Sequence, residues 1–448
     1  MKRMILAVIT LLFTIPVAAQ KNLTLEEAVS IALQRNTSLI KVKNSLSTSE
    51  SQLKSAYGSL IPTLGANAGW SFQRINDAGS TQRDFLGNEV ITPPSQIDNR
   101  SFSAGLGGSV TLFDGLANIA NINQKKNNLR ATEYNIEKKK QDVVYEATNF
   151  YYLVLNAEEL MRVREDNVKY YQKFYETVSE RNRLGIVAKA DVYTAQVQLG
   201  NAELLLIQAQ NSYENTISNL LNYLGLDVLE EYKLVSPFGS EEISESDAYL
   251  AEYDNINAMV GAALDTRFDF KSQQLLVQSA ESGLTMARSG LFPSLSGSYS
   301  YSSGASKFDK LFDRKVLNIS LSLNFPIFSN WNTENQIQFA EVNLKNAKED
   351  LFALERQVKI EVKQGYLDLT AAKKSLDVAS KNVTAAEETR KINQERYNLG
   401  SGTILEVLQA DRDYTDALRN KINTSFDFYT KRDKLNNSLG KLDYKKFE

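Results

Sequence analysis

The chain has 448 residues, of which 51 are basic and 54 are acidic, and it contains no histidine and no cysteine. It therefore lacks the commonest general base, the commonest metal ligand, any disulfide and any cysteine for lipidation, and it offers no basic patch for nucleic acid. Because no phosphate-binding loop or nucleophile motif is present either, we predict that the chain is not an enzyme and has no catalytic residues, cofactor or resident metal.

The first 19 residues are typical of a secretory signal peptide. Lys2 and Arg3 precede an apolar run from Met4 to Val17, and small residues follow. A membrane anchor is the alternative, but the run is shorter than the roughly 20 residues that span a bilayer, and Pro16 interrupts it. We expect cleavage after residue 19, which leaves 49 basic and 54 acidic residues, a net charge of −5 (49 − 54).

A helix is predicted over residues 25–57, and a period-two pattern begins after Pro62. In residues 64–73 and 101–112, apolar side chains alternate with Gly, Ser, Asn and Thr. Such alternation is typical of strands that cross a bilayer, with one face toward lipid and a polar face toward a water-filled lumen. An ordinary half-buried antiparallel sheet is the alternative. Residues 76–100, between the two strands, are rich in turn formers and are predicted to be an exposed loop.

A long helical pattern follows the second strand. From residue 116 to residue 184, apolar side chains recur every seven positions and no proline occurs. The pattern predicts a coiled-coil helix of about 69 residues, roughly 100 Å long at ~1.5 Å per residue. A further helix is predicted over residues 191–224. Because this helix and the one over 25–57 together nearly equal the long helix in length, the two could lie end to end along it.

The second half of the chain repeats the first. Pro62 and Pro293 lie 231 positions apart (293 − 62), whereas Gly185 and Gly400 lie 215 apart (400 − 185), so one loop is 16 residues longer in the first copy (231 − 215). The predicted domains are a signal peptide (1–19), a first structural repeat (20–227), an acidic inter-repeat linker (228–256) and a second structural repeat (257–448).

The second copy carries the same kinds of element. Alternating residues predict strands at 294–301 and 317–325, with residues 302–315 as the loop between them. The seven-residue spacing of apolar side chains then returns from residue 337 to residue 372. The positions predicted to face acyl chains are Leu106, Ile319 and Leu321, and their neighbours Ser320 and Ser322 are predicted to face the lumen.

Four strands cannot close a barrel. Membrane barrels have about eight strands or more, and an open sheet edge in lipid leaves unpaired backbone groups that cost several kcal/mol each. We therefore expect several copies of the chain to share one barrel. A structural periplasmic coiled-coil protein is an alternative from a different class, but it leaves the four amphipathic strands without a lipid-facing role.

Several segments together resemble the TolC-like outer membrane efflux proteins, also called outer membrane factors. Residues 23–36 resemble the opening helix of that family, and residues 61–64 and 292–295 resemble its transition from helix to strand. Residues 181–185 and 396–400 resemble its periplasmic turns. The resemblance covers essentially the whole mature chain, and its strength lies in the order and duplication of the segments.

The resemblance implies a mixed but mainly α-helical fold. Three chains, with four strands each, would form a twelve-stranded outer-membrane β-barrel that continues as a long α-helical coiled-coil barrel in the periplasm of a Gram-negative bacterium. It implies the exit duct of a tripartite efflux system, with outer-membrane lipid, a periplasmic adaptor protein and an inner-membrane transporter as partners. An exit duct for type I protein secretion is the alternative, because the transporter decides the cargo.

The resemblance also implies a gate at the periplasmic mouth, held by an aspartate, a tyrosine and an arginine, with carboxylates around the aperture. Asp191 and Tyr397 match the aspartate and the tyrosine, and Glu406 matches an aperture carboxylate. Gly402 stands at the arginine position and Gln409 at the next carboxylate position, so the family's bidentate clamp is missing. Helix capping is the alternative role for the two carboxylates.

The turns at the far ends of the long helices are where the resemblance places the adaptor. Glycines that simply end a helix are the alternative for the two glycines involved. A milder departure from the family occurs at Thr37 and Phe268, where the family often has proline. The predicted docking residues are Leu184, Gly185, Leu399 and Gly400.

Overall fold

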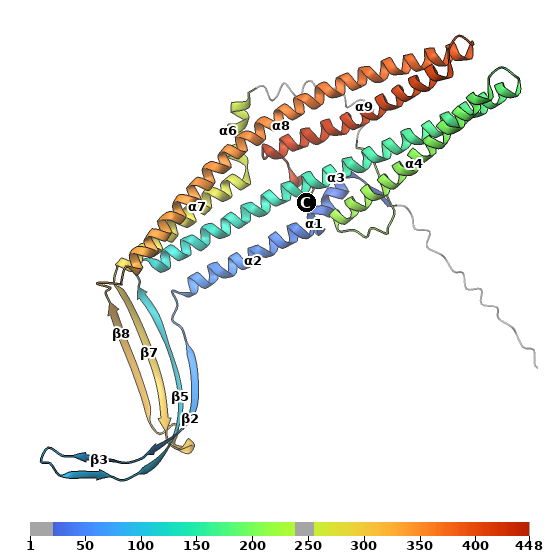
Figure 1. Ribbon diagram of the computed structural model, residues 1–448. Helices are drawn as coiled ribbons and strands as arrows, with labels where there is room; N and C mark the ends of the chain where they lie inside the picture. Colours follow the sequence, from blue (N-terminus) through green and yellow to red (C-terminus); the bar gives the residue numbers. More distant parts are fainter. Residues whose placement is uncertain (1–20, 238–254, 448) are drawn as a thin grey trace, which may run out of the picture. The chain divides into compact units, whose positions relative to one another are not determined.

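The computed structural model describes residues 21–237 and 255–447 (Figure 1). The predicted signal peptide and most of the predicted linker lie outside the described residues. The chain divides into two compact units. The helical unit contains the described residues up to 43, those from 135 to 270 and those from 354 onward, and the sheet unit contains residues 44–134 and 271–353.

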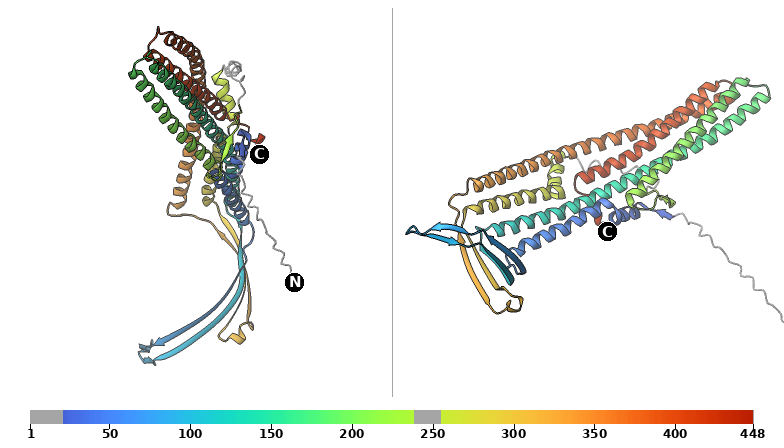
Figure 2. Two further views of the ribbon diagram at one scale, coloured as in Figure 1. Left: turned by 90° about the vertical axis from the view of Figure 1, so that its right-hand side faces the viewer. Right: turned by 60° about the horizontal axis from the view of Figure 1, so that its bottom comes forward.

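The sheet unit contains a four-stranded antiparallel sheet in the order β2-β5-β7-β8 (Figures 1 and 2). The strands are β2 (Gly65–Asp77), β5 (Ser95–Phe113), β7 (Ser294–Ala305) and β8 (Lys315–Asn324). All four predicted strands are therefore present. Within the part of the chain that the structure describes, β2 and β8 each pair with one strand only, so the sheet has two open edges.

The prediction that residues 76–100 form a loop is wrong. The last residues of β2 pair with the first residues of β5 inside this segment, and a separate hairpin of β3 (Ser80–Arg83) and β4 (Glu89–Thr92) lies between them. The carboxylate of Asp84 accepts two backbone N–H groups of the hairpin turn, and Gly87 supplies a φ of +85°. Strands of four residues are too short to show a recognisable alternation.

The second predicted loop, residues 302–315, is also partly ordered. β7 continues into it to Ala305, and a 3-10 helix, η3 (Phe308–Lys310), occupies its middle. The remaining short elements are β1 (Lys21–Leu23), which pairs in parallel with β6 (Tyr232–Leu234), and the 3-10 helices η2 (Ser289–Leu291) and η4 (Tyr444–Lys446).

The register of the sheet places apolar side chains in rows on one face. Leu106 pairs with Tyr301, and Tyr301 pairs with Leu317, and residues paired across antiparallel strands point to the same side. The alternate residues, such as Ser300 opposite Asn318, share the other face. The pattern in the sequence thus gives the sheet one apolar face and one largely uncharged polar face.

Two helices of 67 residues, α3 (Ala117–Arg183) and α8 (Asn332–Asn398), follow the sheet strands, close to the predicted length. Each is followed by a shorter helix, α4 (Lys189–Leu224) or α9 (Ile404–Ser438). Among the described residues, no helix has both the length and the apolar character needed to cross a membrane. The seven-residue spacing is confirmed in the helical unit by the buried residues Val143, Ala147, Val154, Val358, Val362, Leu369 and Leu376.

The helix predicted over residues 25–57 is broken in two, so this prediction is wrong in detail. α1 (Leu25–Arg35) ends and α2 (Thr37–Gly58) begins at Asn36, which is buried. The Asn36 side-chain oxygen accepts two backbone N–H groups at the start of α2, and its amide donates to the carbonyl of Tyr223 at 3.2 Å. Capping by an asparagine therefore breaks the helix where a proline is absent.

The same break occurs 231 positions later (267 − 36), between α6 (Ile256–Thr266) and α7 (Phe268–Arg288). Here the break residue is Arg267, whose side chain is buried. Its guanidinium pairs with Asp269 at 2.5 Å and with Glu361 of α8 at 2.6 Å. The two copies thus bend the chain at equivalent positions by different side-chain chemistry.

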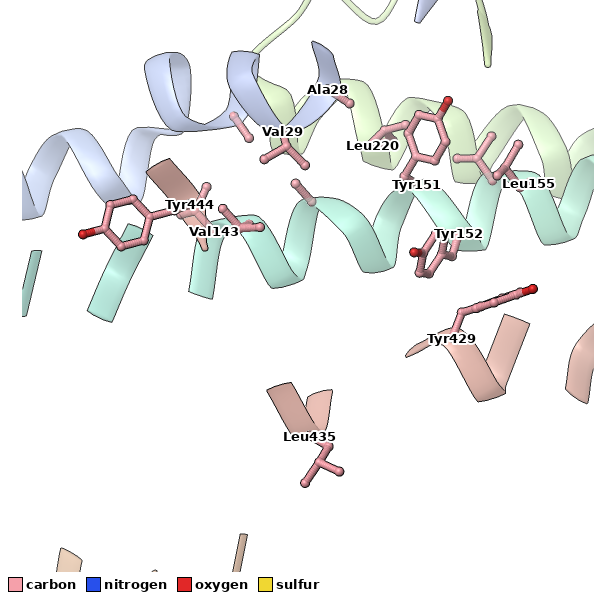
Figure 3. Close-up of a cluster of buried hydrophobic side chains, with 14 of the residues drawn as sticks. Ala28, Val29, Val143, Tyr151, Tyr152, Leu155, Leu220, Tyr429, Leu435 and Tyr444 are labelled. Atoms are coloured by element: carbon pink, nitrogen blue, oxygen red, sulfur yellow. The ribbon is translucent and has the colours of Figure 1, made fainter. Parts of the chain in front are cut away.

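The core of the helical unit contains side chains of α1, α3, α4, α6, α8 and α9, and Figure 3 shows part of it. Tyr151 of α3, Val29 of α1 and Leu220 of α4 belong to one cluster of fully buried side chains. The hydroxyl oxygen of Tyr151 lies 2.8 Å from the carbonyl oxygen of Leu23 and 2.6 Å from that of Val235. The ring fills the core while its hydroxyl satisfies backbone groups near the short parallel strands.

Both long helices begin after two residues in the left-handed region. Gly115 and Leu116 precede α3 with φ of +67° and +74°, and Asn330 and Trp331 precede α8 with φ of +51° and +64°. The pairs lie 215 positions apart (330 − 115), which matches the offset of the repeat. Because non-glycine residues rarely adopt this conformation, the turn from strand to helix is a specific feature of both copies.

We expect Gly115→Ala to destabilise the protein more than Gly87→Ala does. A Cβ at position 115 would lie 2.7 Å from the carbonyl oxygen of Ser289, whereas a Cβ at position 87 meets open space. Both positions have positive φ, which costs a non-glycine residue about 1–2 kcal/mol. Thermal unfolding midpoints of the two variants in detergent measure the difference, and equal midpoints would contradict the predicted close packing of the turn.

Candidate functional site

The two pairs of long and short helices are joined by turns of the same construction. Gly185 follows α3 and Gly400 follows α8, each with a φ of +74°. In the first turn the N–H of Ile186 donates to the carbonyl of Arg181 at 2.9 Å, and the second turn has the equivalent bond at 2.9 Å. No atom lies within 4 Å of a Cβ built on either glycine, so the backbone conformation alone requires glycine here.

An apolar side chain is exposed beside each glycine. Leu184 is 59% exposed and Leu399 is 83% exposed. A water-exposed leucine at the tip of a helical hairpin has no packing role in the single chain, and two such side chains recur at equivalent positions. Their assignment as docking residues, with Gly185 and Gly400, stays a prediction.

Glu406 caps the first turn of α9. Its N–H donates to the hydroxyl of Thr403 at 3.3 Å, and its carboxylate accepts the N–H of Thr403 at 2.8 Å. Arg396 lies 3.5 Å from the other carboxylate oxygen. The Thr403 backbone bond and the Arg396 charge lower the pKa of Glu406. The capping alternative therefore describes the contacts within the chain, and a role at the aperture stays a prediction.

Asp191 lies at the equivalent position of α4, 215 residues earlier (406 − 191), but it does not cap the helix. Ala188 stands where Thr403 stands in the second copy, and α4 begins without a side-chain cap. Asp191 instead lines a cavity of about 570 Å³ together with Arg181 and Tyr397. The two predicted gate residues, Asp191 and Tyr397, are thus brought together, while Glu406 is used in a different way.

Tyr397 is buried. The side chain of Arg181, which was not among the predicted gate residues, lies over its ring. The guanidinium carbon of Arg181, at the end of α3, is 5.1 Å from the ring centroid. Arg181 also donates to the side-chain oxygen of Asn398 at 3.0 Å. The pKa of Tyr397 is raised, mainly by burial and also by the charge of Asp191, and Arg181 offsets only part of this rise. Within the described residues, the buried hydroxyl of Tyr397 has no hydrogen-bond partner.

The position expected to carry the arginine leaves little room for a side chain. A Cβ at Gly402 would lie 3.0 Å from the backbone nitrogen of Tyr397 and 3.1 Å from the Cβ of Arg396. Arg181 approaches the same tyrosine from the neighbouring helical hairpin instead. The cation is therefore present beside Tyr397 but comes from a different part of the chain.

A buried charge cluster joins three helices of the helical unit, and sequence reasoning missed it. The carboxylate of Asp411, on α9, is fully buried, and the Nε of Arg390 on α8 lies 2.9 Å from it, as an ion pair without hydrogen-bond geometry. Asn167 of α3 donates to the same carboxylate at 3.3 Å. The Arg390 guanidinium also lies over the rings of Tyr170 and Tyr414, at 4.4 and 4.8 Å.

Burial raises the pKa of Asp411, and the charge of Arg390 with the polar groups of Tyr171 and Asn167 offsets only part of this effect. The signal that could have revealed the cluster is an aspartate that falls among the buried residues of α9, next to Ala410. Among the described residues, no group of three or more potential metal ligands converges.

The chain is similar to known outer membrane proteins. A model of the family described as "Outer membrane efflux protein" matches residues 28–226 and 259–441. Outer membrane protein TolC of Vibrio cholerae is 22% identical over 424 residues, covering 93% of this chain and 91% of TolC.

Two solved structures share the fold. The outer membrane channel CmeC of Campylobacter jejuni has a TM-score of 0.75 at 18% identity, covering 94% of this chain and 88% of CmeC. The outer membrane protein VceC of Vibrio cholerae has a TM-score of 0.75 at 18% identity, covering 93% of this chain and 96% of VceC. The likeness confirms the predicted combination of sheet strands and long helices.

We expect Asp411→Asn to change how stability depends on pH. Because the folded-state pKa of Asp411 is raised, its ionised form destabilises the folded state, and this cost is absent below pH about 4 and grows as pH rises through the raised pKa. The unfolding midpoint of Asp411→Asn relative to wild type should therefore increase from pH 4 to pH 7. The exposed Asp413→Asn serves as the control, and parallel curves for all three proteins would refute the prediction.

Proposed function

The chain belongs to the outer membrane efflux protein family, and we propose that three copies close one barrel and one helical tunnel. It is an outer-membrane channel that serves as the exit duct of an efflux system. The observation that supports a shared barrel is the open four-stranded sheet, because an edge strand in lipid leaves its N–H and C=O groups unpaired. The number of three copies comes from the resemblance to the family. Three copies supply twelve strands (3 × 4), and the free edge of β8 then pairs with the free edge of β2 from the next copy.

The two faces of the sheet support a lumen filled with water. In the single chain, Leu106, Ile319 and Leu321 are 51%, 76% and 72% exposed, which is unfavourable in water and suitable in lipid. The opposite face is lined by Ser, Asn and Gly, which suits passage of polar cargo without a charge barrier. We infer that the first face contacts acyl chains and that the second lines the duct.

We also infer that Asp191, Tyr397 and Arg181 hold the periplasmic mouth closed. Arg181 supplies the cation that Gly402 cannot supply, and it links the hairpin of α3 and α4 to that of α8 and α9 through the Tyr397 ring and the Asn398 side chain. Asp191 has no capping role, so its carboxylate remains available to a neighbouring hairpin. We do not include Glu406, which caps α9, among the residues that hold the mouth closed.

The resemblance to the family implies a periplasmic adaptor, and the exposed leucines at the tips support its docking there. A periplasmic adaptor protein that contacts Leu184 and Leu399 would cover two exposed leucines at each subunit. Because the glycine turns have open space around them, an approaching adaptor meets no obstruction from this chain. The adaptor then joins the duct to an inner-membrane transporter, which selects the cargo.

We expect Leu321→Arg to reduce the amount of assembled oligomer in the outer membrane much more than Ser320→Arg. An arginine that faces lipid near the middle of the membrane costs about 2–4 kcal/mol, whereas one that faces the lumen stays hydrated. Heat-modifiable migration on gels measures the assembled fraction. Equal losses would disprove the assignment of faces, and a monodisperse monomer in mild detergent would disprove the shared barrel.

We expect Arg181→Gln and Asp191→Ala each to raise the single-channel conductance in planar bilayers several-fold. Each change removes a contact that we place in the closed mouth. Arg183→Gln is the matched control, because Arg183 is an exposed arginine that pairs with Glu180 of its own helix. If Arg183→Gln raised conductance as much as Arg181→Gln, the effect would belong to general charge and the proposed gate would be incorrect.

A further inference from the structure

A pocket in the sheet unit lies where the apolar face of the sheet ends, on β2, β5 and the β7–β8 connection. It has a volume of about 750 Å³, and its lining includes four aromatic side chains, two bases and one carboxylate, that of Asp309. We propose that this pocket binds the phosphorylated headgroup of an anionic lipid in the outer leaflet. The proposal rests on the barrel proposed above. The lining residues used below are Trp70, Phe72, Arg100, Phe102, Lys307 and Phe308.

The register puts the pocket on the lipid-facing side of the sheet. Trp70 pairs with Phe102, and Phe72 pairs with Arg100, and both pairs share the face that carries Leu106. Phe308, from the connection between β7 and β8, packs against Phe102 with ring centroids 5.6 Å apart. The aromatic side chains therefore continue the apolar face along the strands.

The position along the strand places the bases at the membrane surface. On this face of β5, Phe102 and Leu112 are ten residues apart (112 − 102), or about 33 Å at ~3.3 Å per residue. At a tilt of about 40° this length spans a height of about 25 Å, which is the height of the apolar band of a membrane barrel. Arg100 is the next residue on the same face, so it lies just outside the band.

Bases without an ion pair outnumber the carboxylates in and beside the pocket, where Asp309 is part of the lining. Arg74, one position farther along the face of β2, is neutralised by Asp98 through two hydrogen bonds of 2.7 and 2.8 Å. Asp309 and Asp313 are the carboxylates of the β7–β8 connection, which leaves an excess of three positive charges (5 − 2). The bases that form no ion pair within the described residues are Arg100, Lys307, Lys310, Arg314 and Lys315.

These features together select a lipid that carries phosphate. An interfacial belt of aromatic rings occurs in membrane barrels generally and needs no bases beside it. Free arginine and lysine side chains next to the belt provide charge-assisted donors for phosphate oxygens, each contributing about 1 kcal/mol near a membrane surface. The aromatic side chains of the pocket and the adjoining apolar face of the sheet contact the acyl chains. Inorganic phosphate lacks this second part and should bind poorly.

Trp70 gives a direct readout. The chain has two tryptophans, so Trp331→Phe leaves Trp70 as the single fluorophore inside the pocket. The oligomer is reconstituted into phosphatidylcholine and titrated with bis-phosphorylated lipid A that carries brominated acyl chains, which quench tryptophan on contact. We expect saturable quenching at low lipid A, and about 30-fold weaker binding for Arg100→Gln combined with Lys307→Gln.

The control removes the same two charges elsewhere, as Arg83→Gln combined with Lys54→Gln. Equal binding by the two double variants, or equal quenching by dephosphorylated lipid A, would overturn the phosphate site. Full competition by inorganic phosphate would also overturn it, in favour of a simple anion site. If brominated phosphatidylcholine itself failed to quench Trp70, the barrel would be wrong, which distinguishes the failure of the proposed function from the failure of the lipid site.

Discussion

The unpaired edges of one four-stranded sheet determine the rest of this molecule. A bilayer provides no hydrogen-bond donors or acceptors, so the free edges of β2 and β8 are tolerable only when another strand covers them. Closure by further copies of the chain is the arrangement that we propose. The long helices then need an apolar stripe along most of their length, because each packs on neighbours within the chain and between chains. This apolar stripe appears in the sequence as apolar side chains that recur every seven residues.

Much of this fold could be predicted from the sequence because it depends on local periodicity. Alternation located the four strands, and the absence of proline with regular apolar spacing located α3 to within a residue at each end. The break at Asn36 could not be predicted in the same way, because an asparagine gives no signal of its own until its acceptor atoms meet the start of α2. The β3–β4 hairpin was not predicted because strands of four residues are too short to show an alternating pattern.

The candidate site was predictable only in part. Asp191 and Tyr397 were identified from the resemblance to the family's gate, and both line one cavity. Arg181 was not found, because its proximity to Tyr397 depends on how two hairpins more than 200 residues apart in sequence pack together (397 − 181 = 216). The cluster around Asp411 was not found either, because its contacts come from three different helices. Residues whose role arises from packing between distant segments leave no pattern in a single sequence.

The unequal starts of α4 and α9 have a consequence for symmetry. In the proposed trimer, three copies of a duplicated chain would place six similar hairpins around the tunnel, an arrangement close to sixfold symmetry. Thr403 and Glu406 anchor the first turn of α9, whereas Ala188 and Asp191 leave the first turn of α4 unanchored, a difference of about 1 kcal/mol in resistance to fraying. The hairpins therefore form two classes that alternate around the ring. In the proposed trimer, thermal motion at the mouth would then have threefold rather than sixfold symmetry, and opening would move every second hairpin.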